Sequence, residues 1–146
     1  MGGPKVREVM TDKPRCVTPD TPVSEAAELM EREDVGSLPI LDGETLAGVV
    51  TDRDIVVRAV AKGKDPRGMP VREVASRDLV TIRPDEDLSE ALKLMASHQV
   101  RRLPVVDEDN RLIGVVAQAD VAKEAKEKDV GHMVEEISQT PAGPRV

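Results

Sequence analysis

The chain repeats itself, and no other feature constrains its fold as strongly. Short runs recur at a constant offset of 65 positions, the difference between residues 6 and 71. One residue added after Asp107 raises this offset to 66. Agreement in register over most of each copy predicts two copies of one supersecondary unit. The matching runs are Val-Arg-Glu-Val at 6–9 and 71–74, Ser-Glu-Ala at 24–26 and 89–91, Leu-Pro at 38–39 and 103–104, and Gly-Val-Val at 48–50 and 114–116.

Each copy is expected to contain the same elements, in the order β-α-β-β-α after a leading helical turn. In the first copy Thr21 is the expected cap of the first helix, with Pro22 at the first helical position. In the second copy Asp87 and Glu90 are expected to form a capping box. The other elements are expected at 6–10 and 71–75 (helical turn), 16–18 and 80–83 (first strand), 38–41 with 46–50 and 103–106 with 112–116 (hairpin), and 52–62 and 118–128 (second helix).

The fold class predicted by this order is α/β (α+β), with two small repeats in one chain. The first repeat with its N-terminal segment spans 1–62, a linker rich in Gly and Pro spans 63–70, and the second repeat spans 71–128. Residues 129–146 form a C-terminal extension, in which an apolar patch at 130–137 predicts a helical turn or two. The polar end at 139–146 is expected to be a frayed tail.

Composition argues against several classes of function. Cys16 is the single cysteine and cannot form an internal disulfide, which favours a reducing compartment such as the cytoplasm. No apolar run approaches the roughly 18 residues of a membrane span, and the N-terminus lacks the apolar region of a signal peptide. The net charge of −7 opposes attraction to nucleic-acid phosphates, and the absence of Phe, Tyr and Trp removes the usual stacking platforms. We therefore expect a cytoplasmic protein that binds neither membrane nor nucleic acid.

The run Gly-Val-Val-Thr-Asp-Arg-Asp at 48–54 places a hydroxyl and a carboxylate where a strand gives way to a helix. Amides at a helix N-terminus attract phosphate oxygens, to which Thr51 can add a hydrogen bond. Asp54 can accept both hydroxyls of a ribose. The alternative is that Thr51 caps the helix, with Asp54 as its capping-box partner, and that the pair binds nothing. Recurrence of the stretch in the second copy favours binding, and both interpretations stay open.

The repeated pattern resembles the cystathionine β-synthase (CBS) domain. The residues that carry this resemblance are a helix ending in Leu-Met, then Val-x-x-Leu-Pro, an Asp in a turn and the run at 48–54, and it extends over about 6–128. Two copies correspond to the tandem pair called a Bateman module. The Thr-Asp-Arg-Asp-Ile-Val and Val-Arg-Arg-Leu-Pro runs are also similar to stand-alone bacterial CBS pairs involved in stress responses. The resemblance implies two repeats packed about a pseudo-twofold axis, and pairs that join into a homodimer.

The resemblance also implies a regulatory, non-enzymatic module that binds an adenosine-containing ligand in a cleft between the repeats. The resemblance implies ligands such as AMP, ADP, ATP or S-adenosylmethionine. Thr51 would supply the phosphate hydroxyl and Asp54 the ribose carboxylate. The implied purine walls and base-reading backbone are Val17, Thr18, Pro19, Ser37, Leu38 and Pro39.

The second copy departs from this pattern at its own strand-to-helix junction. Ala117 stands where the first copy has Thr51, whereas Asp120 retains the carboxylate. We therefore expect one functional cleft. Arg101 and Arg102 occupy positions that are Gly and Ser in the first copy. The resemblance implies that they contact phosphates, for which the donor fork of arginine is suited, and the alternative is solvated ion pairs with the abundant acids.

The remaining residues do not form a metal or catalytic motif. His98 and His132 are the only histidines, and neither lies at metal-ligand spacing from Cys16. We expect no resident cofactor, and Mg²⁺ only through the phosphates of a ligand, near Asp52, Asp54 or the acidic turn at 107–109. The rival function is a ligand-independent homodimeric scaffold, which could be stress-related and could bind a protein partner not identified by the sequence.

Overall fold

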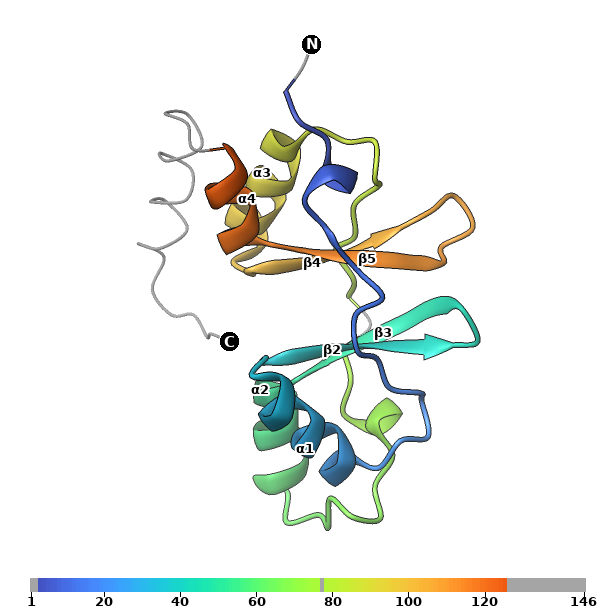
Figure 1. Cartoon of the computed structure of the whole chain (residues 1–146). Coiled ribbons are helices and arrows are strands. Elements are labelled where there is room, and N and C mark those ends of the chain that lie inside the picture. The colour runs from blue at the N-terminus through green and yellow to red at the C-terminus, as the bar shows by residue number, and fades with distance from the viewer. Residues whose placement is uncertain (1–2, 77, 126–146) are drawn as a thin grey trace. The chain divides into compact units, whose positions relative to one another are not determined.

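The computed structural model describes residues 3–76 and 78–125 of the 146-residue chain (Figure 1). Cα packing divides the chain into two compact units. Among the described residues, the first unit comprises 15–79, and the second unit joins the N-terminal segment up to residue 14 to residues 80–125. The packing units therefore differ from the sequence repeats, because the leading helical turn of each repeat packs in the unit formed by the rest of the other repeat.

The first unit is a β-hairpin covered on one face by helices (Figure 1). Strands β2 (Ser37–Asp42) and β3 (Thr45–Thr51) pair antiparallel. Helix α1 (Val23–Glu33) packs against α2 (Asp52–Ile55), which continues as the π-helical turn η2 (Val56–Val60). The 3-10 turn η3 (Val71–Glu73) completes the unit. The buried core residues are Val17, Val23, Ala26, Met30, Leu38, Ile40, Val50, Ile55, Ala59, Met69, Val71 and Val74.

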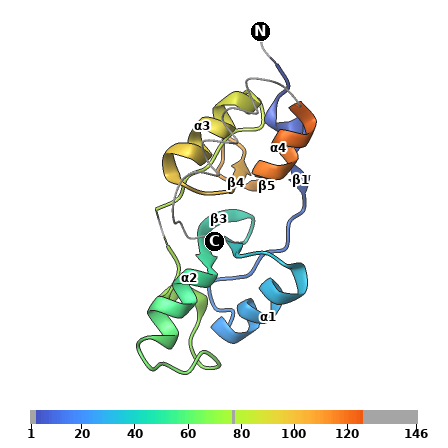
Figure 2. The ribbon, with the colours of Figure 1, turned by 90° about the vertical axis from the view of Figure 1, so that its left-hand side faces the viewer.

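The second unit has the same plan, with α3 (Leu88–His98) and α4 (Gln118–Ala125) on one face of the β4–β5 hairpin (Figure 2). Strands β4 (Arg102–Val106) and β5 (Leu112–Ala117) pair antiparallel, and β1 (Thr11–Asp12) joins the other edge of β5. The 3-10 turn η1 (Val6–Glu8) belongs to this unit. The buried core residues are Val6, Ile82, Leu88, Ala91, Leu92, Met95, Leu103, Val105, Val116 and Val121. The predicted mixed α/β fold class and both hairpins are confirmed.

Helix α1 starts differently from the prediction. The helix begins at Val23 with Pro22 as its N-cap, so Thr21 does not cap it. The hydroxyl of Thr21 instead accepts the N–H of Thr18 at 3.0 Å. The N–H of Val23 donates to the carbonyl oxygen of Met69 at 2.8 Å. A residue from the predicted linker thus satisfies the helix N-terminus, and its side chain is buried as well.

Helix α3 also lacks the predicted capping box. Asp87 is the N-cap residue, but its side chain makes no capping hydrogen bond and Glu90 does not complete a box. The carboxylate of Asp87 accepts a hydrogen bond from Nζ of Lys5 at 2.8 Å. This bond lowers the pKa of Asp87 and raises that of Lys5. The N–H of Leu88 donates to the carbonyl oxygen of Pro4 at 3.0 Å, so the N-terminal segment completes the start of α3.

The second helix of the first unit ends earlier than its predicted limit at residue 62. Its last part is π-helical, and the N–H of Ala61 donates to the carbonyl oxygen of Val56 at 2.8 Å. Gly63, at φ +71°, follows. In the second unit α4 is described as far as Ala125, and the expectations for the rest of 118–128 and for 129–146 lie outside the described residues. No helix in the described ranges has the length and apolar character that crossing a membrane requires.

The first helix of each unit ends with a residue in the left-handed region, Asp34 at φ 56° and Gln99 at φ 57°. A residue with a Cβ is strained there, and glycine is not. We expect Gln99→Gly to raise the free energy of unfolding by about 1 kcal/mol, as measured by urea denaturation. Ala96→Gly, one turn earlier with helical φ, should lower it by about 1 kcal/mol. A loss of stability in Gln99→Gly would contradict this expectation.

Candidate functional site

The junction of β3 and α2 is held by a reciprocal pair of hydrogen bonds. The hydroxyl of Thr51 accepts the N–H of Asp54 at 3.0 Å. Oδ2 of Asp54 accepts the N–H of Thr51, also at 3.0 Å. This is the capping box that the sequence offered as the structural alternative to a binding site. It fixes the rotamers of both side chains at the first turn of the helix.

The capping box uses only one oxygen of the Asp54 carboxylate. The other oxygen, Oδ1, lies 3.9 Å from Nη1 of Arg58, which is too long for a hydrogen bond. The side chain of Asp54 is 13% exposed, so this oxygen lies in a partly desolvated position. A carboxylate oxygen has two lone pairs, and Oδ1 can accept from a vicinal diol while Oδ2 stays in the box. The capping and binding interpretations are therefore compatible.

The neighbouring predicted residues lie on the same small sheet. Ser37 stands opposite Thr51 in the β2–β3 register, with Leu38 and Pro39 next along β2. The N–H of Val17 donates to the carbonyl oxygen of Pro39 at 3.0 Å, which sets residue 17 beside β2. The side chains of Val17 and Leu38 belong to the core, at 7% and 2% exposure. Their part in a purine wall remains a prediction, and their burial favours contact through the backbone.

Thr18 and Pro19 lie in the turn that precedes α1. The Thr18 side chain is exposed, and its hydroxyl lies 3.0 Å from that of Thr21. The carbonyl oxygen of Pro19 accepts the N–H of Arg72 at 3.2 Å. Both residues are thus held by local contacts within the first unit.

The corresponding corner of the second unit gathers the other predicted residues. Arg102 pairs with Ala117 in the β4–β5 register, and the carbonyl oxygen of Arg101 accepts the N–H of Gln118 at 2.8 Å. Asp120 lies in the first turn of α4. Both arginine side chains are exposed, and among the described residues neither forms an ion pair. Their contact with phosphate remains a prediction.

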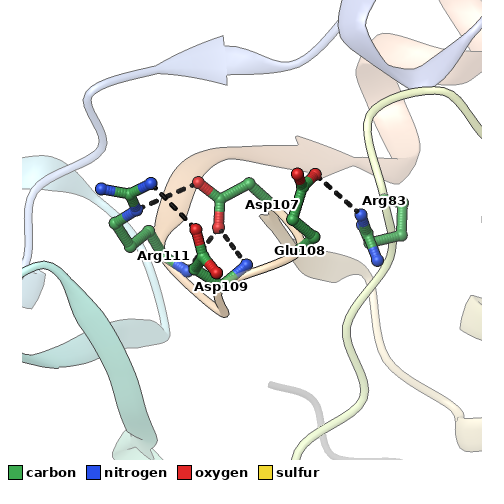
Figure 3. Close-up of polar contacts among 5 residues, drawn as sticks. All are labelled: Arg83, Asp107, Glu108, Asp109 and Arg111. Atoms are coloured by element: carbon green, nitrogen blue, oxygen red, sulfur yellow. Dashed lines mark hydrogen bonds and ion pairs between the residues drawn. The ribbon is translucent and has the colours of Figure 1, made fainter.

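The acidic turn between β4 and β5 is a structural network (Figure 3). Oδ1 of Asp107 accepts the N–H groups of Asp109 and Arg111, both at 2.9 Å. The guanidinium of Arg111 reaches Asp107 at 3.2 Å and Asp109 at 3.1 Å. Glu108 lies 3.5 Å from the guanidinium of Arg83. These carboxylates are engaged by arginine, and the described parts of the chain hold no group of three or more His, Cys, Asp or Glu suited to a metal ion.

The backbone N–H of Arg111, and to a lesser degree that of Asp109, lowers the pKa of Asp107 below its ordinary 3.8. A carboxylate with a depressed folded-state pKa stabilises the fold above its unfolded-state pKa, and this stabilisation is lost as pH falls through the folded-state value. We expect Asp107→Asn to lower the free energy of unfolding at pH 7. The difference in this free energy between variant and wild type should shrink below pH 3.8. Urea denaturation across pH checks this, with Glu108→Gln as control. A difference between variant and wild type that does not change with pH would contradict this stabilisation by the Asp107 carboxylate.

The family model of the CBS domain matches residues 6–60 and 71–127 of the chain. The chain belongs to the CBS domain family. It is a CBS pair, the regulatory module formed by two such domains, as the resemblance in the repeats indicated. Each match includes one strand-to-helix corner.

Relatives and solved structures agree with this assignment. Hypoxic response protein 1 of Mycobacterium tuberculosis is 36% identical over 132 residues, which cover 90% of this chain and 92% of that protein. A crystal structure of Hypoxic Response Protein I with two coordinated zinc ions superposes with a TM-score of 0.75 at 37% identity, and the match covers 82% of this chain and 98% of that one. The predicted similarity to stand-alone bacterial CBS pairs is therefore confirmed.

Two further structures contain adenosine-based ligands. CBSX2 in complex with AMP has a TM-score of 0.75 and 31% identity, with coverage of 85% of this chain and 97% of that one. The CBS domain pair of protein MJ0100, in complex with 5-methylthioadenosine and S-adenosyl-L-methionine, has a TM-score of 0.73 and 25% identity. That match covers 85% of this chain and 98% of the other.

Arg58 is a residue of this corner that the sequence pattern did not single out. It follows Asp54 by four positions, a spacing that places two side chains on one helix face and indicates an ion pair. Its stronger contacts, to backbone carbonyls of residues 74 and 75, involve a segment beyond the linker. No local pattern indicates these.

Proposed function

We propose that this CBS pair is a sensor that binds an adenosine-containing ligand at the Thr51/Asp54 corner of the first unit. The main support is the Asp54 carboxylate, one oxygen of which is fixed by the Thr51 N–H while the other, within the described part of the chain, accepts no hydrogen bond and lies 3.9 Å from Arg58. A carboxylate held in this way can accept the two ribose hydroxyls without losing side-chain entropy on binding. The AMP complex of CBSX2 and the S-adenosyl-L-methionine complex of MJ0100 support the ligand class.

One ligand per chain is the proposed stoichiometry. The N–H groups of the first turn of α2, together with the hydroxyl of Thr51, suit a phosphate or another polar group next to the ribose. Ala117 offers no hydroxyl at the equivalent corner, although Asp120 is present. The proposed mode of action is reversible binding without chemical change to the ligand, in the cytoplasm, where adenine nucleotides are abundant.

Isothermal titration with AMP, ATP and S-adenosylmethionine, the nucleotides with and without Mg²⁺, tests this function. We expect saturable heat for at least one ligand, with a stoichiometry near one per chain. Incubation with ATP should release no ADP or AMP above the buffer control. Absence of heat for every ligand at millimolar concentration would contradict the sensor and favour the ligand-independent scaffold.

We also propose that the CBS pair forms a homodimer through η2. Val56, Val57 and Val60 on this turn are 57%, 41% and 60% exposed. The second repeat has Ala122, Lys123 and Lys126 at the positions equivalent to Val56, Val57 and Val60, so its sequence does not repeat the three valines. A single patch suits a contact between identical surfaces of two chains about a twofold axis.

Aspartate in the patch formed by Val56, Val57 and Val60 should separate the dimer into monomers. We expect the double variant Val56→Asp/Val60→Asp to raise the dimer dissociation constant by about 100-fold or more, because each charge would be desolvated without a partner. Light scattering after size exclusion, over a range of concentrations, measures this constant. Ala122→Asp, at the position equivalent to Val56, is the control. A wild-type chain that stays monomeric at high concentration would contradict the dimer.

A further inference from the structure

A single guanidinium nitrogen joins the proposed ribose carboxylate to the backbone of a distant segment. Nη1 of Arg58 donates to the carbonyl oxygens of Val74 at 3.0 Å and Ala75 at 3.3 Å. The same nitrogen lies 3.9 Å from Oδ1 of Asp54, the oxygen that the capping box leaves unused. Arg58 is 49% exposed, yet it is positioned by contacts on both sides.

The contacted segment, residues 74–76, lies along the strand that ends at the corner. The N–H of Ser76 donates to the carbonyl oxygen of Val49 at 3.1 Å, and the N–H of Val49 donates to that of Ser76 at 3.4 Å. A Cβ at Gly48 would lie 3.3 Å from the Ser76 carbonyl oxygen, so glycine permits this close approach. The same segment leads to Leu79, where the chain leaves the first unit for the second.

The second repeat carries no such arginine. Glu124 stands at the position equivalent to Arg58, four residues after Asp120. Two acids at this spacing repel one another on a helix. Arg58 and the hydroxyl of Thr51 thus occur in the same repeat, which is the one with the complete strand-to-helix corner.

We propose that Arg58 is a positioning residue that couples ligand binding at Asp54 to segment 74–76. This inference rests on the proposed function. Ribose hydroxyls that donate to Oδ1 replace Arg58 as the neighbour of that oxygen. Donation to Oδ1 weakens the attraction between the carboxylate and the guanidinium, whose existing hydrogen bonds to the carbonyls of Val74 and Ala75 then strengthen and hold the segment more tightly against β3. Because the ligand and the segment both depend on one guanidinium, ligand binding changes the free energy with which segment 74–76 pairs with β3.

Amide hydrogen exchange measured by NMR tests the coupling at single residues. The amides of Ser76 and Val49 report on the pairing of the segment with β3. The comparison uses wild type, Arg58→Met and Lys62→Met, each with and without saturating AMP, or S-adenosylmethionine if AMP gives no heat. Lys62→Met removes the same charge from an exposed site in the turn that follows η2. Arg58→Lys keeps the charge without the fork of donors.

In wild type and Lys62→Met, ligand should slow exchange at Ser76 and Val49 by roughly fivefold, the factor that one net hydrogen bond contributes. Arg58→Met should bind ligand but lose this slowing, and Arg58→Lys should retain part of it. If Arg58 had only a structural role, Arg58→Met would change the exchange rates by the same factor in the free and in the ligand-bound protein. Ligand slowing that persists in Arg58→Met, or that is absent in wild type with ligand bound, overturns the coupling and leaves the proposed function standing. If none of the ligands binds, both fail.

Discussion

Asp54→Asn should weaken AMP binding by about 10-fold to 100-fold, since hydrogen bonds to a charged group contribute about 1.5–3 kcal/mol. The carbonyl oxygen of asparagine can still accept the N–H of Thr51, so the capping box and the start of α2 are retained. With that oxygen in the box, an amide NH2 takes the place of Oδ1, so the variant loses both the negative charge and the acceptor for two hydroxyls. Isothermal titration of wild type and variant under the same salt conditions measures the loss.

The control for this variant is Asp52→Asn, in the same helical turn. Asp52 is exposed, and its Oδ1 accepts the N–H of Arg53 at 2.7 Å, so the change removes an equal charge from beside the site. We expect its affinity to stay within about twofold of wild type, because exposed charges are screened. Equal losses in the two variants would show that net charge, and not the position of Asp54, determines affinity. An unchanged affinity in Asp54→Asn would show that Asp54 does not bind the ribose hydroxyls.

Gly114→Ala should lower the free energy of unfolding by about 3 kcal/mol, at the upper end of what overpacking costs. A Cβ at Gly114 would lie 2.8 Å from the carbonyl oxygen of Thr11 and 2.9 Å from the sulfur of Met10. The backbone oxygen cannot move without breaking the pairing of β1 with β5. The N-terminal segment would therefore be displaced from the second unit.

Gly48 is the equivalent residue in the first unit and provides the matched comparison. Its Cβ would lie 3.3 Å from the carbonyl oxygen of Ser76, a distance that a small shift relieves. We expect Gly48→Ala to cost about 1 kcal/mol or less. Urea denaturation of both variants measures the two losses in free energy of unfolding. A loss in Gly48→Ala that equals or exceeds that in Gly114→Ala would contradict the tighter packing of the N-terminal segment on β5.

The hairpins and helices of both units were predictable because they depend on local pattern. Alternation and turn residues place each hairpin strand within a residue or two of its observed limits. The capping box of Thr51 and Asp54 was also predictable, because its residues are three positions apart. The same reasoning failed for Thr21 and Asp87. The N-termini of α1 and α3 are completed by Met69 and by the Lys5 segment, which lie far away in the sequence.

The assignment of segments to units could not be predicted from the repeat. A duplicated sequence shows that two copies exist, but not which copy the leading turn of each one packs with. Val6 is fully buried in the core of the second unit, and Val71 is fully buried in that of the first. Each packs in an apolar core of similar composition, because the repeats are alike. The contact of Arg58 with the carbonyls of Val74 and Ala75 depends on this exchange and was therefore missed as well.

NMR titration of the wild-type chain with AMP and with S-adenosylmethionine tests most directly whether the ligand binds at the first-unit corner. The backbone N–H groups of Thr51 and Asp54 donate the two hydrogen bonds of the capping box, so a ligand at Oδ1 must alter their chemical shifts. Binding at this corner predicts saturable shifts of both amides on one binding curve, with smaller changes at Gln118 and Asp120. Saturable shifts elsewhere in the chain, with Thr51 and Asp54 unmoved, would contradict it.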